Sequence, residues 1–261
     1  MQMRHHGDTV GDGLLTMLSV DKTFGADIKA LKDMSLQVNV GDFISLLGPS
    51  GCGKSTALRI IASLINPTSG RVEWDGDHSR GSVGIVFQEP TLMPWATVAK
   101  NVWLPHRLSG ISFRKARSKI EDCLKVVGLE DFSNSYPREL SGGMKMRVSI
   151  ARALVTDPRI ILMDEPFAAL DEITRFKLNN DLLQLKENVG CTVIFVTHSV
   201  FESVFLSNRI AVMVARPGRV FEEVVIDEGY PRDESFRTSS SYAAYCRRVS
   251  ESLRRSTNAK T

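Results

Sequence analysis

A glycine-rich loop constrains this 261-residue chain more than any other feature: Gly48-Pro49-Ser50-Gly51-Cys52-Gly53-Lys54-Ser55-Thr56. It follows the apolar run 43–47 and precedes residues 57–62, whose apolar spacing is helical, so the order is strand, loop, helix. Glycines lack a Cβ atom, which lets successive backbone N–H groups point at phosphate oxygens, and the positive end of the following helix attracts the same anion. The pattern predicts a phosphate-binding loop, and an ordinary tight turn is the weaker interpretation.

Two side chains of this loop have the chemistry that a nucleoside triphosphate needs. The ammonium of Lys54 would contact the β- and γ-phosphates, and the hydroxyl of Ser55 would ligate Mg²⁺. We therefore expect ATP and Mg²⁺ as ligands.

Composition and charge narrow the class of protein. With 43% hydrophobic and 24% charged residues the chain is typical of a soluble globular protein, and its net charge of +3 is too small to indicate nucleic-acid binding. No apolar run approaches the ~18 residues of a membrane-spanning helix, and residues 1–13 are polar rather than signal-like. The four cysteines are far apart, which favours reduced thiols in a cytosolic protein over a zinc or redox site.

Two early strands are expected on either side of an aromatic residue. Residues 14–20 read as a strand, and residues 34–40 alternate apolar and polar side chains as a half-buried antiparallel strand does. Phe24 lies between them, in a predicted loop. Its ring could stack on a nucleobase or close the small sheet, and the sequence does not separate these two roles.

Two further strands are expected before the middle of the chain. Residues 71–74 read as a strand with Asp75-Gly76 as a hairpin turn, and residues 83–88 read as a buried strand. The second strand ends on Gln88, whose amide could reach a metal or a water molecule in a cleft. Glutamine ends many strands, so this indication is weak by itself.

The stretch from 89 to about 156 has helical spacing and predicts a helical lobe inserted between strands of one α/β core. Within it, Ser141-Gly142-Gly143 stands at a helix start, where a hydroxyl and free N–H groups make a second phosphate site. One nucleotide does not need two γ-phosphate sites on one chain. The second site therefore suggests a phosphate that is supplied from elsewhere.

A pair of carboxylates, Asp164 and Glu165, follows the apolar run 160–163, which is typical of a central parallel strand. The carboxyl end of such a strand is where open α/β sheets bind ligands. Two adjacent anions in a partly desolvated cleft repel each other unless a cation is present. We expect Asp164 to hold Mg²⁺ and Glu165 to orient and polarise water, and a helix-capping acidic pair is the alternative.

His198 ends another predicted buried strand, 191–198, beside the one that carries the carboxylates. A lone histidine is more often structural, yet this position favours a contact with the γ-phosphate. Between the two strands a helix is expected from about 172 to 188. A hairpin is expected at 210–226, and a helix rich in arginine at 239–255, which we interpret as a solvated capping helix rather than a partner or lipid contact.

Taken together and in this order, the motifs resemble those of the nucleotide-binding subunit of ATP-binding-cassette (ABC) transporters, over about residues 14–225. The resemblance implies that residues 48–56 are the Walker A loop and that Phe24 stacks on adenine. It also implies these roles: Gln88 in the Q-loop, 140–144 as the signature, Asp164 and Glu165 as Walker B aspartate and catalytic glutamate, Asp171 in the D-loop and His198 as the switch histidine.

In this family two subunits sandwich two ATP molecules head to tail. The resemblance therefore implies that Ser141 and Gly143 touch the γ-phosphate held by the partner, and that an isolated monomer is nearly inactive. One departure is Met144, which stands where the signature usually has glutamine. Met144 and the segment 88–98 are similar to the branch that imports nitrate, sulfonates and taurine.

The resemblance also implies a fold and its limits. We expect an α/β P-loop core with a mainly parallel sheet, an N-terminal antiparallel β subdomain and an inserted helical subdomain at about 89–156. The expected limits are a flexible terminus at 1–13, the ATPase domain at 14–233 and a helical tail at 234–261.

The function implied by the resemblance is that of an ATPase subunit that powers an importer from the cytoplasmic face of the inner membrane. Its expected partners are a second nucleotide-binding subunit, separate membrane permease subunits and, indirectly, a solute-binding protein, with no nucleic acid. The alternative is a cassette ATPase acting on nucleic acid or the ribosome. Such proteins usually carry two fused cassettes or a long coiled coil, whereas this chain has one phosphate loop and no heptad array. A small-molecule P-loop kinase would leave Ser141-Gly142-Gly143 and His198 unexplained.

Overall fold

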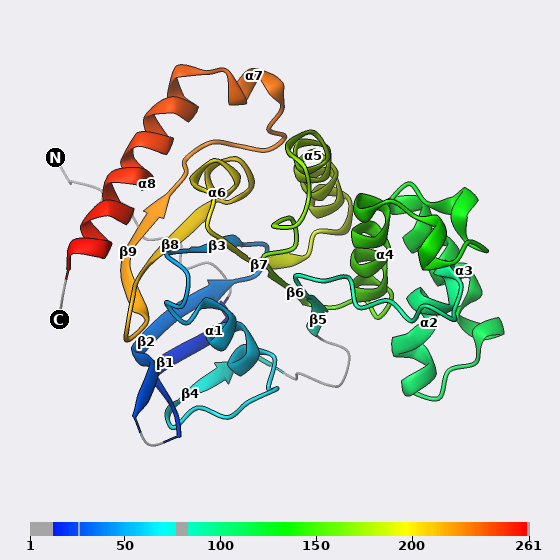
Figure 1. Ribbon diagram of the computed structural model, residues 1–261, viewed down its shortest axis with the longest axis horizontal. Coiled ribbons are helices and arrows are strands. Elements are labelled where there is room, and N and C mark those ends of the chain that lie inside the picture. Colours follow the sequence, from blue (N-terminus) through cyan, green and yellow to red (C-terminus); the bar gives the residue numbers. More distant parts are fainter. Residues whose placement is uncertain (1–12, 26, 77–82, 260–261) are drawn as a thin grey trace, which may run out of the picture.

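Two β-sheets form the body of the molecule in the computed structural model, which describes residues 13–25, 27–76 and 83–259 (Figure 1). The larger sheet has six strands in the order β5-β6-β7-β3-β8-β9. Its strands are β3 (Phe43–Leu47), β5 (Val83–Val86), β6 (Ile160–Asp164), β7 (Thr192–Thr197), β8 (Arg209–Val214) and β9 (Arg219–Val225). All neighbours in this sheet are parallel except β8 and β9, so the predicted α/β core with a mainly parallel sheet is confirmed.

The three central strands are buried along almost their whole length. Every residue of β3 and β7 is buried, as are the first four residues of β6, because helices cover both faces of a parallel sheet. The register places Asp164 of β6 beside Val196, and Leu47 of β3 beside Thr197. The carboxyl ends of these strands therefore meet at one edge, where the glycine loop, the carboxylates and His198 all follow.

The smaller sheet is antiparallel, in the order β2-β1-β4. Its strands are β1 (Gly13–Phe24), β2 (Ile28–Asn39) and β4 (Ser69–Trp74). Two details of the sequence prediction are wrong here. Phe24 is the last residue of β1 rather than part of a loop, and Asp75-Gly76 does not close a hairpin, because β4 pairs with β1 while β5 belongs to the larger sheet.

A group of helices lies apart from the sheets, on the right of Figure 1. The chain forms it between β5 and β6, as predicted for an inserted helical lobe, from α2 (Val98–Leu108), α3 (Phe113–Val126), α4 (Gly142–Leu154) and the 3₁₀ turns η1 (Glu130–Phe132) and η2 (Pro137–Glu139). The other helices are α1 (Lys54–Ile61), α5 (Glu172–Val189), α6 (Val200–Leu206), α7 (Glu234–Arg237) and α8 (Ser240–Asn258). None of the helices in the described ranges is long and apolar enough to cross a bilayer.

The C-terminal helix α8 packs onto the larger sheet beside α6 (Figure 1). Its residues Cys246 and Val249 are buried in the same hydrophobic cluster as the sheet, and the Tyr242 hydroxyl donates to the carbonyl of Phe201 at 3.0 Å. The structure thus agrees with a capping helix. The expected domain limits remain a prediction, and most of the expected flexible terminus, residues 1–12, lies outside the described residues.

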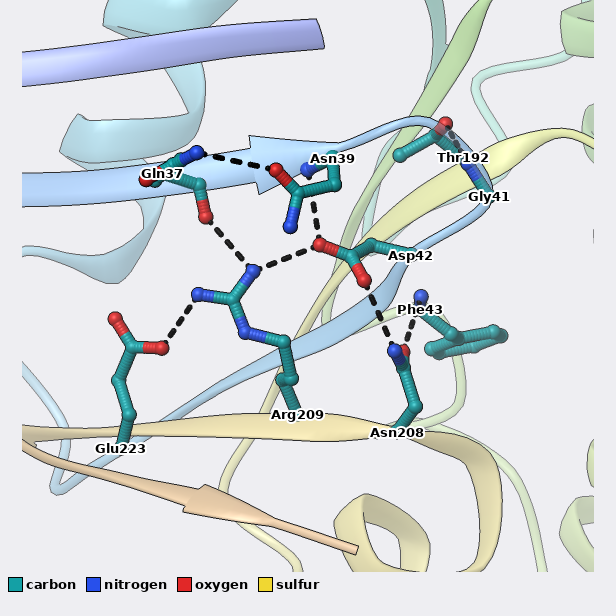
Figure 2. A network of polar contacts seen from close by, with 9 residues as sticks. All are labelled: Gln37, Asn39, Gly41, Asp42, Phe43, Thr192, Asn208, Arg209 and Glu223. Atoms are coloured by element: carbon teal, nitrogen blue, oxygen red, sulfur yellow. Dashed lines mark hydrogen bonds and ion pairs between the residues drawn. The ribbon is translucent and has the colours of Figure 1, made fainter. Parts of the chain in front are cut away.

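A polar network joins the two sheets where β2 leads into β3 (Figure 2). The carboxylate of Asp42 accepts from Arg209 Nη1 at 2.7 Å and from Asn208 Nδ2 at 2.9 Å. Arg209 also donates to the Gln37 carbonyl at 3.0 Å and to Glu223 Oε2 at 2.6 Å. One guanidinium thereby ties β2 of the small sheet to β8 and β9 of the large one.

Candidate nucleotide-binding site

The glycine loop between β3 and α1 has the backbone conformation that its sequence predicts. Gly51 and Gly53 have φ angles of 78° and 90°, in the left-handed region that favours glycine. A Cβ atom on Gly53 would lie 2.8 Å from the Ala30 carbonyl oxygen, so no other residue fits without displacing β2. A pocket of about 220 Å³ opens beside the loop, lined by Ala30, Ser50, Gly51, Gly53, Lys54, Ser55, Thr56 and Glu165.

Lys54 is the cation of this pocket. Its side chain is 4% exposed, and its ammonium donates to the carbonyl oxygens of Gly48 at 2.8 Å and Pro49 at 3.1 Å. The nearest carboxylate oxygen, Glu165 Oε1, is 3.8 Å away. Carbonyl dipoles compensate a buried charge less fully than an anion does, so the residues fit a bound phosphate.

Ser55 and Asp164 meet at the pocket from two different elements. The Ser55 hydroxyl, in the first turn of α1, donates to Asp164 Oδ1 at the end of β6 over 2.7 Å. Hydroxyl and carboxylate oxygens are the ligands that Mg²⁺ prefers. These two residues therefore fit Mg²⁺ next to the phosphates, as the sequence predicts.

Glu165 is held in an unusual backbone conformation between the side chains of Lys54 and His198. Its φ of 47° is strained for a residue with a side chain, and its N–H donates to the Val196 carbonyl at 3.0 Å. The two carboxylate oxygens lie 3.8 Å from Lys54 Nζ and 3.6 Å from His198 Nδ1. The structure thus brings three of the predicted residues together, with Glu165 between Lys54 and His198.

Other predicted residues do not line this pocket. Phe24 is 39% exposed at the end of β1, with Lys22 Nζ 5.1 Å from the centre of its ring. Gln88 does not end β5, as the sequence predicted, because the strand ends at Val86 and Gln88 is exposed in the segment after it. Their proposed contacts with adenine and with Mg²⁺ or water stay predictions.

The segment Ser141-Gly142-Gly143 caps and begins α4, and it packs against Leu170 before α5 and Thr174 in the first turn of α5. The Ser141 hydroxyl accepts from the N–H of Met144 at 3.3 Å, while the Met144 side chain packs on the hydrophobic core. A Cβ on Gly142 would lie 3.3 Å from Leu170 Cδ2, and one on Gly143 would lie 2.7 Å from Thr174 Cγ2. The glycines therefore also serve close packing.

Asp171 caps the start of α5. Its carboxylate accepts from the N–H of Thr174 at 2.9 Å, and the bonds to Thr174 hold the pKa of this carboxyl below its usual value. A capped, ionised Asp171 is compatible with the D-loop position, and its expected role at a nucleotide stays a prediction.

The sequence reasoning missed the turn between β8 and β9, which it treated only as a hairpin. Gly218 donates to the Ala30 carbonyl at 2.9 Å, and a Cβ on Gly218 would lie 2.0 Å from the Cys52 carbonyl oxygen. This turn therefore supports the glycine loop from outside. Nothing in the local pattern signals that contact, because it joins residues far apart in the sequence.

Comparison with known proteins decides the family. The sequence profile of a family described as "ABC transporter" matches residues 31–168. The chain belongs to this family. It is 50% identical over 228 residues to an uncharacterised ABC transporter ATP-binding protein of Methanocaldococcus jannaschii, covering 86% of this chain and 84% of the relative.

Two further similar proteins bear on the activity of this chain and on its oligomeric state. The ABC subunit is 41% identical over 218 residues to the aliphatic sulfonates import ATP-binding protein SsuB of Bacillus thuringiensis, covering 82% of this chain and 84% of the relative. A solved ATP-binding cassette, described as dimeric in a post-hydrolysis state bound to ADP and Pi, superimposes with a TM-score of 0.71 at 37% identity, covering 83% of this chain and all of that one. The protein is thus an ATPase that uses ATP and Mg²⁺.

Proposed function

We propose that this ABC ATPase hydrolyses ATP as a dimer and so powers an importer. The observation that carries the proposal is the separation of two phosphate-binding segments. The pocket beside Lys54 has the acidic residue and the glycine loop, yet none of its lining residues comes from Ser141-Gly142-Gly143. A second copy, placed head to tail, would bring its own segment 141–143 to this pocket, which accounts for two phosphate sites on one chain.

The chemistry in the closed dimer follows from the residues around Glu165. Mg²⁺ held by Ser55 and Asp164 would neutralise charge on the β- and γ-phosphates. Lys54 would bind the same phosphates, and Glu165 would orient and polarise a water molecule by accepting a hydrogen bond from it. His198 would hold the carboxylate and contact the γ-phosphate. Segment 141–143 of the other copy would add hydrogen-bond donors to the γ-phosphate that is transferred. In other phosphoryl-transfer enzymes, electrostatic elements supplied in trans raise the rate by about 10³- to 10⁵-fold.

The membrane partner is proposed from the helical lobe and the segment that leads to it. Trp95, in the segment that follows Gln88, and Leu108, at the end of α2, are 77% and 80% exposed and offer apolar surface to a partner. Separate permease subunits would cover it, placing the protein at the cytoplasmic face of the inner membrane, with a solute-binding protein delivering the solute. Of the nitrate, sulfonate and taurine types of solute, the name of the SsuB relative supports an aliphatic sulfonate.

Light scattering on the Glu165→Gln variant tests the shared site. This change removes the charge that polarises water while leaving Lys54 and Ser55 to bind ATP, so we expect ATP to convert monomers into stable dimers. ADP should leave the variant monomeric. A protein that stays monomeric with ATP demonstrably bound would contradict the proposal.

Co-purification separates the transport role from the alternative role on nucleic acid or ribosomes. We expect a tagged chain, expressed in its own cells, to be recovered with membranes and integral membrane proteins. Recovery with ribosomes or nucleic acid, and not with membranes, would overturn the importer proposal.

A further inference from the structure

A buried carboxylate fixes the loop that carries the switch histidine. Glu202, in the first turn of α6, is 7% exposed, and its Oε2 accepts from the Thr197 hydroxyl at 2.6 Å. The same Thr197 oxygen accepts from the N–H of Ser199 at 3.0 Å. Glu202 therefore holds both neighbours of His198 through one hydroxyl.

Arg175 connects this carboxylate to the segment before α5. Its Nε lies 3.5 Å from Glu202 Oε1, and its Nη2 donates to the Leu170 carbonyl at 3.2 Å. The Nε–H is buried and has no aligned acceptor, so the ion pair is looser than a hydrogen-bonded one. A small movement of either segment would tighten or break it.

The chain of contacts continues to the signature. Leu170, whose carbonyl Arg175 holds, also lies against Gly142, where a Cβ atom would approach its Cδ2 to 3.3 Å. The contacts thus run from Gly142 through Leu170, Arg175 and Glu202 to the neighbours of His198. Each link joins a different element: α4, the segment before α5, α5 itself and α6.

We propose that Arg175 and Glu202 are positioning residues that couple the signature to the switch histidine within one subunit. The inference rests on the dimer proposed above. In that dimer the signature contacts the nucleotide bound by the partner, and His198 contacts the nucleotide bound by its own subunit. The Arg175–Glu202 pair would therefore make the two shared sites close and open together. Neither residue lines the pocket beside Lys54, and both line a small cavity that also touches Glu165 and His198. We therefore assign them a positioning role through the segments that they hold.

Physical chemistry explains why an ion pair suits this task. Glu202 is buried and Arg175 is partly exposed, so removing the arginine would leave the carboxylate desolvated without its opposite charge and cost free energy. Burial raises the pKa of Glu202, and the hydrogen bond from Thr197, followed by the charge of Arg175, opposes that rise. The pair therefore favours the arrangement of the two segments in which both charges meet.

Three variants test the coupling. Glu202→Gln keeps an acceptor for the Thr197 hydroxyl but removes the negative charge that Arg175 faces. Arg175→Lys keeps the positive charge but lacks the planar guanidinium that reaches two acceptors. The third variant combines the two substitutions. We expect each to bind ATP within about twofold of the parent yet lose about tenfold in kcat. In the Glu165→Gln background the dimer dissociation constant should rise about tenfold. The combined variant should lose little more than the larger single loss, since both act on one link.

A matched control separates coupling from a general loss of stability. Asp42→Asn removes one carboxylate of the Asp42–Arg209 network, whose side chains are 8% and 18% exposed, compared with 9% and 31% for Glu202 and Arg175 (Figure 2). It touches neither the signature nor the switch segment, so kcat and dimerisation should stay unchanged while the melting temperature falls. Equal losses in control and test variants would mean that the pair is merely structural.

The outcomes distinguish the inference from the proposed function. If the Glu165→Gln parent forms ATP-dependent dimers and the Arg175 and Glu202 variants do so equally well with unchanged kcat, the coupling is refuted and the dimer stands. If the parent itself stays monomeric with ATP bound, the dimer fails and the coupling fails with it. Arg175→Lys is the variant least prone to unfold, because it leaves Glu202 facing a cation.

Discussion

At the scale of single residues, Lys54 shows how a local motif specifies chemistry. Its ammonium is buried against two carbonyl oxygens of its own loop, within 3.1 Å. Each neutral carbonyl oxygen binds the ammonium less strongly than a charged phosphate oxygen would. The sequence was sufficient to predict this residue, because the loop and the helix that position it are contiguous in the chain.

Replacing Lys54 by alanine should weaken ATP binding by about 10- to 100-fold, because hydrogen bonds to charged groups contribute roughly 1.5–3 kcal/mol each. Fluorescence titration with a labelled ATP analogue measures the dissociation constant. Lys100→Ala, at an exposed lysine of α2, is the control and should bind normally. Unchanged affinity in Lys54→Ala would remove this residue from the phosphate site.

The cysteine thiols give a second test at this scale. Cys52, Cys123, Cys191 and Cys246 are all buried, and burial raises the pKa of each, that of Cys123 to about 11. A raised pKa means less thiolate at pH 8, and the thiolate is the reactive form. We expect Ellman's reagent to react slowly with the native protein at pH 8 and with all four thiols in guanidinium chloride. A fast-reacting thiol in the native protein would contradict the burial.

At the scale of elements, side-chain capping by a nearby residue determines where most helices begin. Thr97, Ser112, Ser141 and Ser239 each cap a helix by accepting from a backbone N–H three residues later. Short α7 was not expected from the sequence, although Asp233 caps its start by accepting from the N–H groups of Ser235 and Phe236. Phe236 also packs against the core, a contact that no periodic pattern of four residues can reveal.

The end of α6 depends on a residue from a distant segment. Arg232 is 5% exposed, and its Nη1 donates to the carbonyl oxygens of Val204, Phe205 and Ser207 at 2.9–3.1 Å. A guanidinium at a helix C-terminus satisfies carbonyls that lack an intrahelical partner and opposes the negative end of the helix dipole. Arg232 thus stabilises the helix that carries Glu202.

Arg232→Met should lower the free energy of unfolding by about 2–4 kcal/mol, because several buried carbonyls would lose their donor. Urea denaturation followed by circular dichroism measures the change. The control is Arg248→Met, at an exposed arginine of α8, which should change stability by less than about 0.5 kcal/mol. A loss no larger than that of the control would show that water replaces the guanidinium.

At the scale of the whole molecule, the proposed dimer makes each active site from two chains. The Lys54→Ala subunit lacks a phosphate-binding lysine but keeps its signature. The Ser141→Arg subunit keeps its own pocket but presents a bulky cation in the signature. Each variant alone should hydrolyse ATP poorly, the first because it binds ATP weakly and the second because its dimer cannot close.

Mixing the two variants should restore activity. If subunits exchange freely, half of the dimers are mixed and each mixed dimer has one intact site of two, so about a quarter of the wild-type rate should return. A phosphate-release assay on the mixture, beside each variant alone, measures it. No recovery in a mixture that light scattering shows to contain dimers would mean that the signature does not act in trans.

The sequence by itself determined the features whose parts are contiguous. The glycine loop, the carboxylates after 160–163, the histidine after 191–197 and the cap of each long helix all follow from neighbouring residues, since backbone geometry and capping act over a few positions. The tertiary structure alone decided the strand order, in which β3 lies between β7 and β8, and the link from Arg175 to Glu202. Those contacts join residues far apart in the chain, and only packing of the assembled core selects them from many equivalent pairings.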